Sequence, residues 1–490
     1  MVEGAAVDVL DSPEAGGAAI RGGVLRLAGY AGGMALALAV APLLIRHLGV
    51  VDFGRYTLVI SLIAMVQGLT EGGLAAVGLR EYTVFDPAHR RRLMQELLGL
   101  RIVLTFAGVA LAVVFGLVAG YDGELIAGTV VAGVGLLLLV LFNLLTIPLQ
   151  ADLRFGWITV AEVLRQAIAA VLIVALVIAG AGIVPFIATQ IPAGIVALAI
   201  AAVLVRKAIS LRPAFQPGAW WTLVRETLPY AIAIAIAALY FRIVIVLMSL
   251  VSTETQTGYF ATSYRVIEVL VAIPALLVSA TFPVMSRAAR DDADRLLYAG
   301  QRTFDAMLIV GVWLTLCVAL GADFMIQVIG GEDFEASVDV LRIQSLAVMC
   351  TFVTVTCGFL LLSLRRHTAI LASSVVPLTF GVILTLAIAP SEGAEGAAIA
   401  TVVAEAGFAA AVLAFVKRRS VAHVPLSLRV FLPVGAAAAL AASVELLIPD
   451  VHEVITVGLA TAIYFAVLTA LRQIPPELRG ALAPGRERDG

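Results

Sequence analysis

Long hydrophobic runs, separated by short polar connections, extend along the chain from residue 23 to residue 471. Each run is long enough to cross about 30 Å of hydrocarbon as an α-helix, which takes roughly 20 residues. No run shows the sustained two-residue alternation that is typical of a transmembrane β-barrel. The pattern therefore predicts an all-α integral membrane protein with about 14 transmembrane helices. The runs are 23–45, 56–79, 97–119, 124–147, 157–179, 183–205, 228–251, 259–284, 303–322, 341–363, 369–389, 396–416, 429–448 and 453–471.

Basic residues in the connections predict the orientation. If the N-terminus is cytoplasmic, the inner connections and the two tails carry 24 of the 32 lysines and arginines. The outer connections carry only Arg46 and Arg55, and the remaining six basic residues lie within the apolar runs. An excess of basic residues in short loops marks the cytoplasmic side of a membrane. We therefore expect both termini to be cytoplasmic.

The composition of the 490 residues agrees with this interpretation. Hydrophobic residues make up 61% and charged residues 13% of the chain, whereas ordinary soluble domains are about 25% charged. This excludes a soluble enzyme, a disordered chain and a protein with a single membrane anchor. No connection between runs exceeds about 25 residues, so we expect no soluble domain.

A weak internal repeat predicts the domain organisation. Residues 48–56 and 250–259 each lead from a leucine through a polar turn to a glycine and an aromatic residue. Repeats of this kind are common in secondary transporters. The predicted parts are a disordered cytoplasmic tail at 1–22, six helices at 23–205, a cytoplasmic linker at 206–227, six helices at 228–416, a terminal helix pair at 429–471 and a second cytoplasmic tail at 472–490.

Signatures of catalysis and of nucleotide binding are missing from the sequence. The phosphate-binding pattern GxxxxGK[ST] does not occur, and the five histidines have no evident catalytic partners. The three cysteines lie in apolar runs, where packing explains them better than metal binding. We expect no enzymatic activity, no cofactor, no metal site and no nucleic-acid partner.

Nine ionisable residues inside the predicted spans are the candidate functional groups, because charge within a membrane is costly. They are Arg26, Arg101, Arg165, Arg242, Arg265, Glu71, Glu162, Glu268 and Glu405. One interpretation is structural: Arg26 and Arg101 extend to the interface, and the pairs Glu162–Arg165 and Arg265–Glu268 neutralise each other along one helix face. The other interpretation is a cavity lined by these arginines, which bind phosphate through a fork of donors. The glutamates are then candidates for ion coupling or ion pairing.

Four segments resemble motifs of polysaccharide-biosynthesis flippases of the Wzx type, in the multidrug/oligosaccharidyl-lipid/polysaccharide (MOP) superfamily. They are RHLG…FGRY at 46–56, LPY…YFRI…TGYFA…YR…IP…FPVMS at 228–286, IGGEDF at 329–334 and GAEGAAIA at 393–400. The resemblance extends over residues 22–420. In one respect the sequence departs from many relatives, which carry an acidic residue two positions after the arginine that is Arg242 here. In this sequence that position is Val244. Any role that the family gives to this acidic residue, including ion coupling, is therefore in doubt for this chain.

The resemblance implies two helical lobes with alternating access. It also implies a flippase in the bacterial plasma membrane that moves an undecaprenyl-diphosphate-linked oligosaccharide to the outer leaflet for surface polysaccharide export. The implied partners are this substrate, membrane lipids and the polysaccharide polymerase or export machinery. Two other functions stay open at this stage. They are a cation-coupled drug or metabolite exporter of the same superfamily and a membrane glycan polymerase.

Overall fold

The computed structural model describes residues 15–71, 73–418, 424, 426–447 and 452–473. Its contacts divide the chain into two compact units, Met1–Val246 and Leu247–Gly490. The division falls inside one helix, whereas the sequence predicts a linker at 206–227. Helix α1 begins at Ala15, within the predicted N-terminal tail. Residues 1–14 and 474–490 of the two predicted tails lie outside the described residues.

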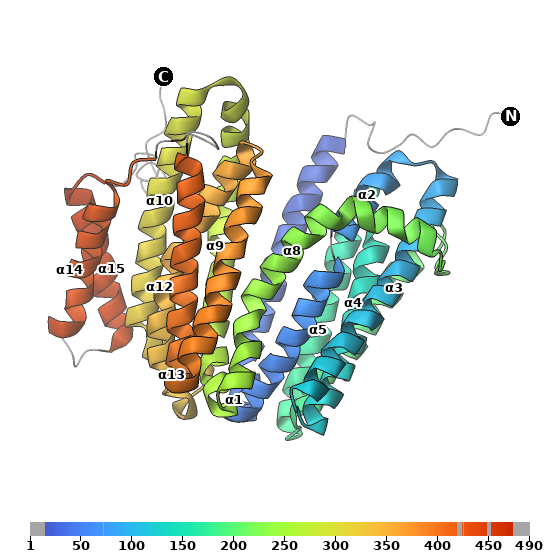
Figure 1. Ribbon diagram of the computed structural model, residues 1–490, viewed down its shortest axis with the longest axis horizontal. Coiled ribbons are helices and arrows are strands. Elements are labelled where there is room, and N and C mark those ends of the chain that lie inside the picture. Colours follow the sequence, from blue (N-terminus) through green and yellow to red (C-terminus); the bar gives the residue numbers. More distant parts are fainter. Residues whose placement is uncertain (1–14, 72, 419–423, 425, 448–451, 474–490) are drawn as a thin grey trace. The chain divides into compact units, whose positions relative to one another are not determined.

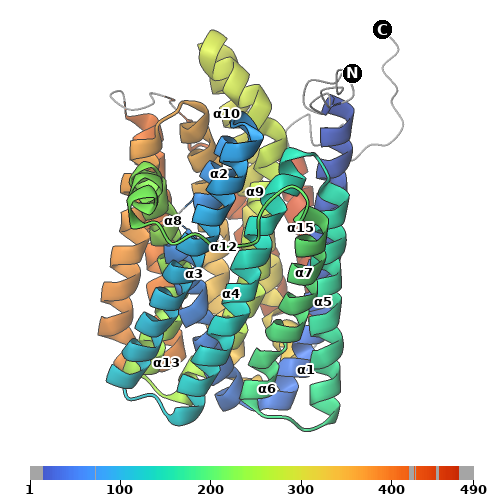
Figure 2. The same ribbon diagram turned by 90° about the vertical axis from the view of Figure 1, so that its right-hand side faces the viewer.

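Helices make up the first unit (Figure 1). They are α1 (Ala15–Glu71), α2 (Leu74–Val84), α3 (Pro87–Val118), α4 (Gly123–Ala151), α5 (Phe155–Ile178), α6 (Ile183–Ala188), α7 (Gln190–Val205) and most of α8 (Pro217–Val251). Helices α3, α4, α7 and α5 lie side by side in this order (Figure 2). Apolar side chains of α2, α3, α4, α5 and α7 form one core cluster, and those of α1, α4 and α6 contribute to another.

The second unit contains the remaining helices. They are α9 (Glu254–Asp291), α10 (Ala293–Leu320), α11 (Ala322–Ile329), a 3-10 turn (Glu332–Phe334), α12 (Ser337–Ser363), α13 (His367–Lys417), α14 (Phe431–Leu447) and α15 (Glu453–Ala470). Helices α14 and α15 are the predicted terminal pair, and both pack on α10. The buried Tyr464 hydroxyl donates a hydrogen bond of 2.9 Å to the carbonyl oxygen of Ile309, which fixes α15 to α10.

Ten described helical segments are long and apolar enough to cross a membrane. The two longest, Gly23–Val84 and His367–Lys417, each include two predicted spans. Each is interrupted by a glycine with non-helical angles, Gly49 (φ 71°) and Gly393 (φ 57°). Both glycines lie between predicted runs, and Figure 1 shows α1 and α13 each running to one end of its unit and back. The predicted all-α membrane fold is confirmed, and the number of fourteen spans stays a prediction.

The predicted span 56–79 is not a single helix. Helix α1 ends at Glu71, and α2 begins at Leu74 after Gly73, which has φ 73°. Glycine adopts this left-handed conformation without the steric penalty of a side chain. The adjacent glycines at 72 and 73 are the signal in the sequence, and the continuous apolar pattern hides it.

Two glycines bring α1 close to α5. A Cβ atom on Gly29 would lie 2.2 Å from Cγ2 of Thr159, and one on Gly33 would lie 2.1 Å from Oε1 of Gln166. The two glycines are four residues apart and therefore share one face of α1. Their GxxxG spacing thus allows the close packing of these two helices that such motifs provide in membranes.

Candidate functional site

A polar cavity of about 590 Å³ lies within the first unit, between α1, α2, α4 and α5. Its charged lining residues are Arg26, Glu71 and Glu162. Its uncharged polar lining residues are Tyr30, Gln67, Asn143, Thr146, Gln150 and Thr159. Hydrogen-bonding groups are thus concentrated inside a bundle of apolar helices, where such groups are costly unless they have hydrogen-bond partners. Several have partners within the protein, among them Glu162 with Arg165 and Gln150 with Thr146.

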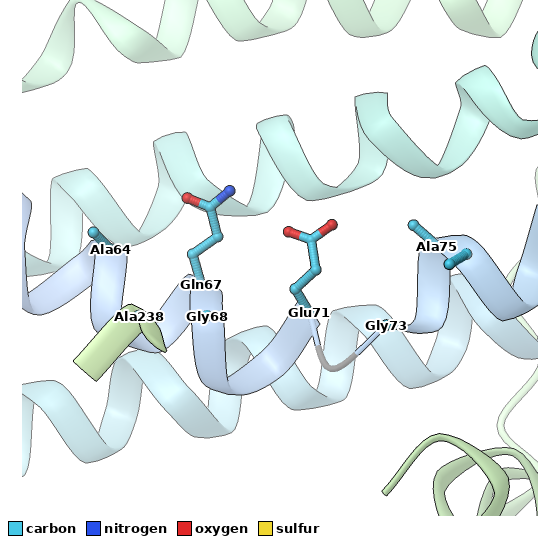
Figure 3. A pocket seen from close by; sticks show the side chains of 8 residues that line it. Ala64, Gln67, Gly68, Glu71, Gly73, Ala75 and Ala238 are labelled. Carbon is cyan, nitrogen blue, oxygen red and sulfur yellow. The ribbon is translucent and has the colours of Figure 1, made fainter. Parts of the chain in front are cut away.

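Gln67 and Glu71 line both this cavity and a second one. Figure 3 shows both side chains extending from α1 in the same direction, one helical turn apart. They also line a neighbouring cavity of about 390 Å³, whose other walls are small residues of α1, α2 and α8. The two side chains therefore present an amide and a carboxylate at the point where α1 ends.

Arg101 of α3 contacts both Glu71 and the backbone at the end of α1. Its Nη2 lies 3.6 Å from Oε1 of Glu71, and its Nη1 donates a hydrogen bond of 3.2 Å to the carbonyl oxygen of Thr70. The last carbonyl groups of a helix have no partner within the helix, and a cation at this end is also favoured by the helix dipole. The Arg101 side chain is only 2% exposed. We infer that Arg101 holds the broken end of α1 in place and orients Glu71.

Glu162 is held in a similar way on α5. Arg165 contacts it through two hydrogen bonds of 2.6 and 3.1 Å, and Nε2 of Gln166 donates a third of 2.9 Å. Nη1 of Arg165 also donates to Oε1 of Gln190 at 3.2 Å. Arg165 thus has its donors committed to Glu162 and Gln190, while Glu162 reaches the cavity wall.

Arg26 is different from the other two arginines of the first unit's site. Its side chain is exposed and lines the cavity. Within the described part of the chain it forms neither a hydrogen bond nor an ion pair. Its positive charge interacts with the negative charge of Glu162 on the same wall. Of these three arginines, it is the one that lines the described cavity and can contact an anion there. From the sequence, all three arginines are candidate substrate ligands, with Arg26 and Arg101 near the interface and Arg165 deeper in its span. The fold shows which of them lines the cavity.

The other predicted residues lie outside this cavity's described lining. Arg242 is a partly buried residue of α8, in the first unit. Arg265 and Glu268 of α9 form a half-exposed ion pair of 2.8 Å in the second unit. Glu405 of α13 is 7% exposed.

Several cavity residues escaped the sequence analysis because they carry no charge. Gln67 and Asn143 lie within predicted spans, and Gln150 lies just beyond one. Amide side chains are uncommon in apolar runs, and this rarity was the feature of the sequence that could have indicated these cavity residues. No group of three or more histidine, cysteine, aspartate or glutamate side chains suited to a metal ion occurs among the described residues.

Comparisons with known proteins identify the family. The model of the polysaccharide biosynthesis protein family matches residues 43–339, which include Glu71, Arg101 and Glu162. The chain belongs to this family. The resemblance stated from the sequence is therefore confirmed. No curated protein matches the sequence.

Solved structures of the MOP superfamily share the fold of this polysaccharide biosynthesis protein. The lipid II flippase MurJ, in an inward closed conformation, superimposes with a TM-score of 0.76 at 12% identity, covering 92% of this chain and 99% of that one. An inward-facing multidrug resistance transporter of the MATE family gives 0.61 at 16% identity, with coverages of 80% and 96%. A MOP transporter from Pyrococcus furiosus gives 0.52 at 19% identity, with coverages of 84% and 97%. The protein is thus a multi-pass membrane protein with the fold of MOP-superfamily transporters.

Proposed function

We propose that this polysaccharide biosynthesis protein is a flippase for a lipid-linked oligosaccharide, carried on undecaprenyl diphosphate. It moves this substrate from the cytoplasmic to the outer leaflet of the bacterial plasma membrane by alternating access. The family, the fold shared with a lipid II flippase and the polar cavity support the proposal. The observation that carries it is the composition of the cavity wall. Its groups suit a sugar–phosphate headgroup and lie within apolar helices.

In this proposal, the cavity binds the headgroup by hydrogen bonds. Arg26 donates to a phosphate oxygen, because a guanidinium group binds phosphate through two parallel bonds. The amides of Gln67 and Asn143 and the carboxylates of Glu71 and Glu162 bind sugar hydroxyl groups. Arg101 and Arg165 position these carboxylates and reduce the cost of their charge.

Roles for the other predicted residues belong to the same proposal. Arg242 of α8 and Arg265 of α9 stay candidate ligands of the diphosphate, each within its own unit. Glu71, Glu268 and Glu405 are the groups on which an ion gradient could act, since a carboxylate changes charge when it takes up a proton. A substitution that stops transport by a folded protein supports a role in binding or coupling. A substitution that only prevents folding supports a structural role.

A deletion experiment tests the proposed function. Lipid-linked glycans are extracted from a strain without the gene and from the same strain carrying the gene on a plasmid. A flippase predicts that a complete lipid-linked repeat unit accumulates in the deletion strain and that surface polysaccharide is lost. A polymerase predicts single repeat units that still reach the surface, and a drug exporter predicts unchanged glycan with altered drug resistance. Either of the latter results contradicts the proposal.

A further inference from the structure

The segment from Arg206 to Leu228, here called the linker segment, joins α7 to α8 and includes the first turns of α8. It contains four basic residues and one acidic residue. In two perpendicular views, the first half of α8 crosses the direction of the long helices of its unit (Figure 1, Figure 2). We therefore expect this element to lie along the membrane surface rather than through the membrane.

One side of the linker segment is fixed to α3. The Ala214 backbone N–H donates to the carbonyl oxygen of Gln95 at 2.9 Å, and Nε1 of Trp220 donates to that of Glu96 at 3.1 Å. Gly99 makes this approach possible, since a Cβ atom there would lie 2.1 Å from the carbonyl oxygen of Ala214. Leu223 is buried in the core of the first unit. The linker segment is therefore a docked element.

The exposed side chains of the linker segment include bulky apolar and basic ones, and Trp221, Arg225 and Leu228 share one face of α8 by their spacing. The exposed apolar residues are Leu211 (43%), Phe215 (58%), Trp221 (68%) and Leu228 (49%). The exposed basic residues are Arg206, Lys207, Arg212 and Arg225. Tryptophan prefers the headgroup level of a bilayer, and basic residues beside apolar ones favour anionic lipid surfaces. The basic and the exposed apolar side chains of the linker segment therefore both favour a surface of anionic lipids.

We propose that the linker segment is a binding site for anionic phospholipid headgroups at the membrane surface. Trp221 and Phe215 lie among the acyl chain ends nearest the headgroups, and Lys207, Arg212 and Arg225 contact the phosphates. The binding does not depend on which substrate the protein transports. Because Gly99 and Trp220 hold the segment against α3, bound lipid contacts a fixed part of the first unit.

A lipid-retention experiment tests this proposal. The full chain is purified in nanodiscs of phosphatidylcholine mixed with phosphatidylglycerol, and the lipid retained after transfer to mild detergent is measured by mass spectrometry. Wild type retains phosphatidylglycerol selectively. The triple variant Lys207→Gln/Arg212→Gln/Arg225→Gln loses this selectivity by about fivefold per charge removed, roughly a hundredfold in total.

The control removes the same number of exposed basic residues, three arginines of α9 and α10, as Arg287→Gln/Arg290→Gln/Arg295→Gln. It keeps the selectivity. An equal loss in the control, or none in the linker variant, overturns the proposal.

Fluorescence gives a second measurement that does not depend on the charge variants. Lipids brominated near the headgroup quench a fraction of the tryptophan emission, and that fraction falls in Trp221→Phe. If Trp221 instead docks another protein, these lipids leave its emission unchanged, and the proposal is wrong.

Discussion

Arg101 of α3 donates a hydrogen bond to the carbonyl oxygen of Thr70 at the point where α1 breaks, and it lies 3.6 Å from the Glu71 carboxylate. One guanidinium group thus serves both the free end of a helix and a charge on the wall of a polar cavity. Broken helices within transporters place polar groups at membrane depth. This arrangement links the fold of the first unit to its proposed function.

Removal of one partner from this pair should destabilise the protein. Arg101→Gln leaves the half-buried Glu71 charge without its cation, and we expect a loss of about 3 kcal/mol. The double variant Arg101→Gln/Glu71→Gln should recover much of this loss, because no uncompensated charge remains. Thermal unfolding of the purified variants measures both effects. If the two substitutions destabilise additively, the pair is not coupled, and our account of Arg101 is wrong.

Adjacent glycines of α1 provide a matched comparison. A Cβ atom on Gly33 meets the side-chain amide of Gln166, whereas one on Gly32 has no neighbour within 4 Å. Gly33→Ala should displace Gln166 from Glu162 and weaken binding at the cavity. Gly32→Ala should leave binding unchanged and slightly favour the helix, since alanine is preferred over glycine there by up to about 1 kcal/mol.

Substrate affinity and thermal stability of both glycine variants check this prediction. If both substitutions change affinity and stability equally, the position of the Gln166 side chain does not depend on the missing Cβ atom of Gly33.

Acid should weaken the start of α4. Partial burial acts to raise the pKa of Asp122, but the hydrogen bond from the Leu125 backbone N–H and the charge of Arg55 outweigh it, so the pKa lies below its ordinary value of 3.8. A lowered pKa in the folded state stabilises the protein above the unfolded pKa, and this contribution is lost as pH falls through the folded pKa. Asp122→Asn removes this titration.

The measurement is the melting temperature of both proteins as the pH is lowered from neutral to below 3.8. The advantage of wild type over Asp122→Asn should shrink across the acidic end of this range. A constant difference would contradict the assigned role of Asp122.

Helical spacing made two ion pairs among the candidate residues predictable from the sequence. Residues three apart share a helix face, and Glu162–Arg165 and Arg265–Glu268 are ion pairs in the structure. The positions of the apolar runs likewise predicted the membrane fold. Both inferences need only local geometry.

The remaining features depend on long-range packing. Glu71 and Arg101 are 30 residues apart and come from different helices, so no periodicity connects them. The break between α1 and α2 depends on the left-handed conformation of Gly73, which hydropathy does not detect. Arg26 is exposed and lines the cavity, whereas Arg101 is buried against Glu71 and Thr70, and the fold alone decides this difference.

We propose that the protein moves a lipid-linked oligosaccharide whose headgroup binds in the cavity of the first unit, with Arg26 as a phosphate ligand. The most direct measurement reconstitutes the protein into liposomes that contain this lipid and follows its accessibility to a sugar-modifying enzyme outside. We predict that wild type makes the inner-leaflet lipid accessible and that Arg26→Gln, which should fold normally, is severely slowed. Full translocation by Arg26→Gln would contradict the assigned site, and no translocation by well-folded wild type, with any coupling gradient supplied, would contradict the function.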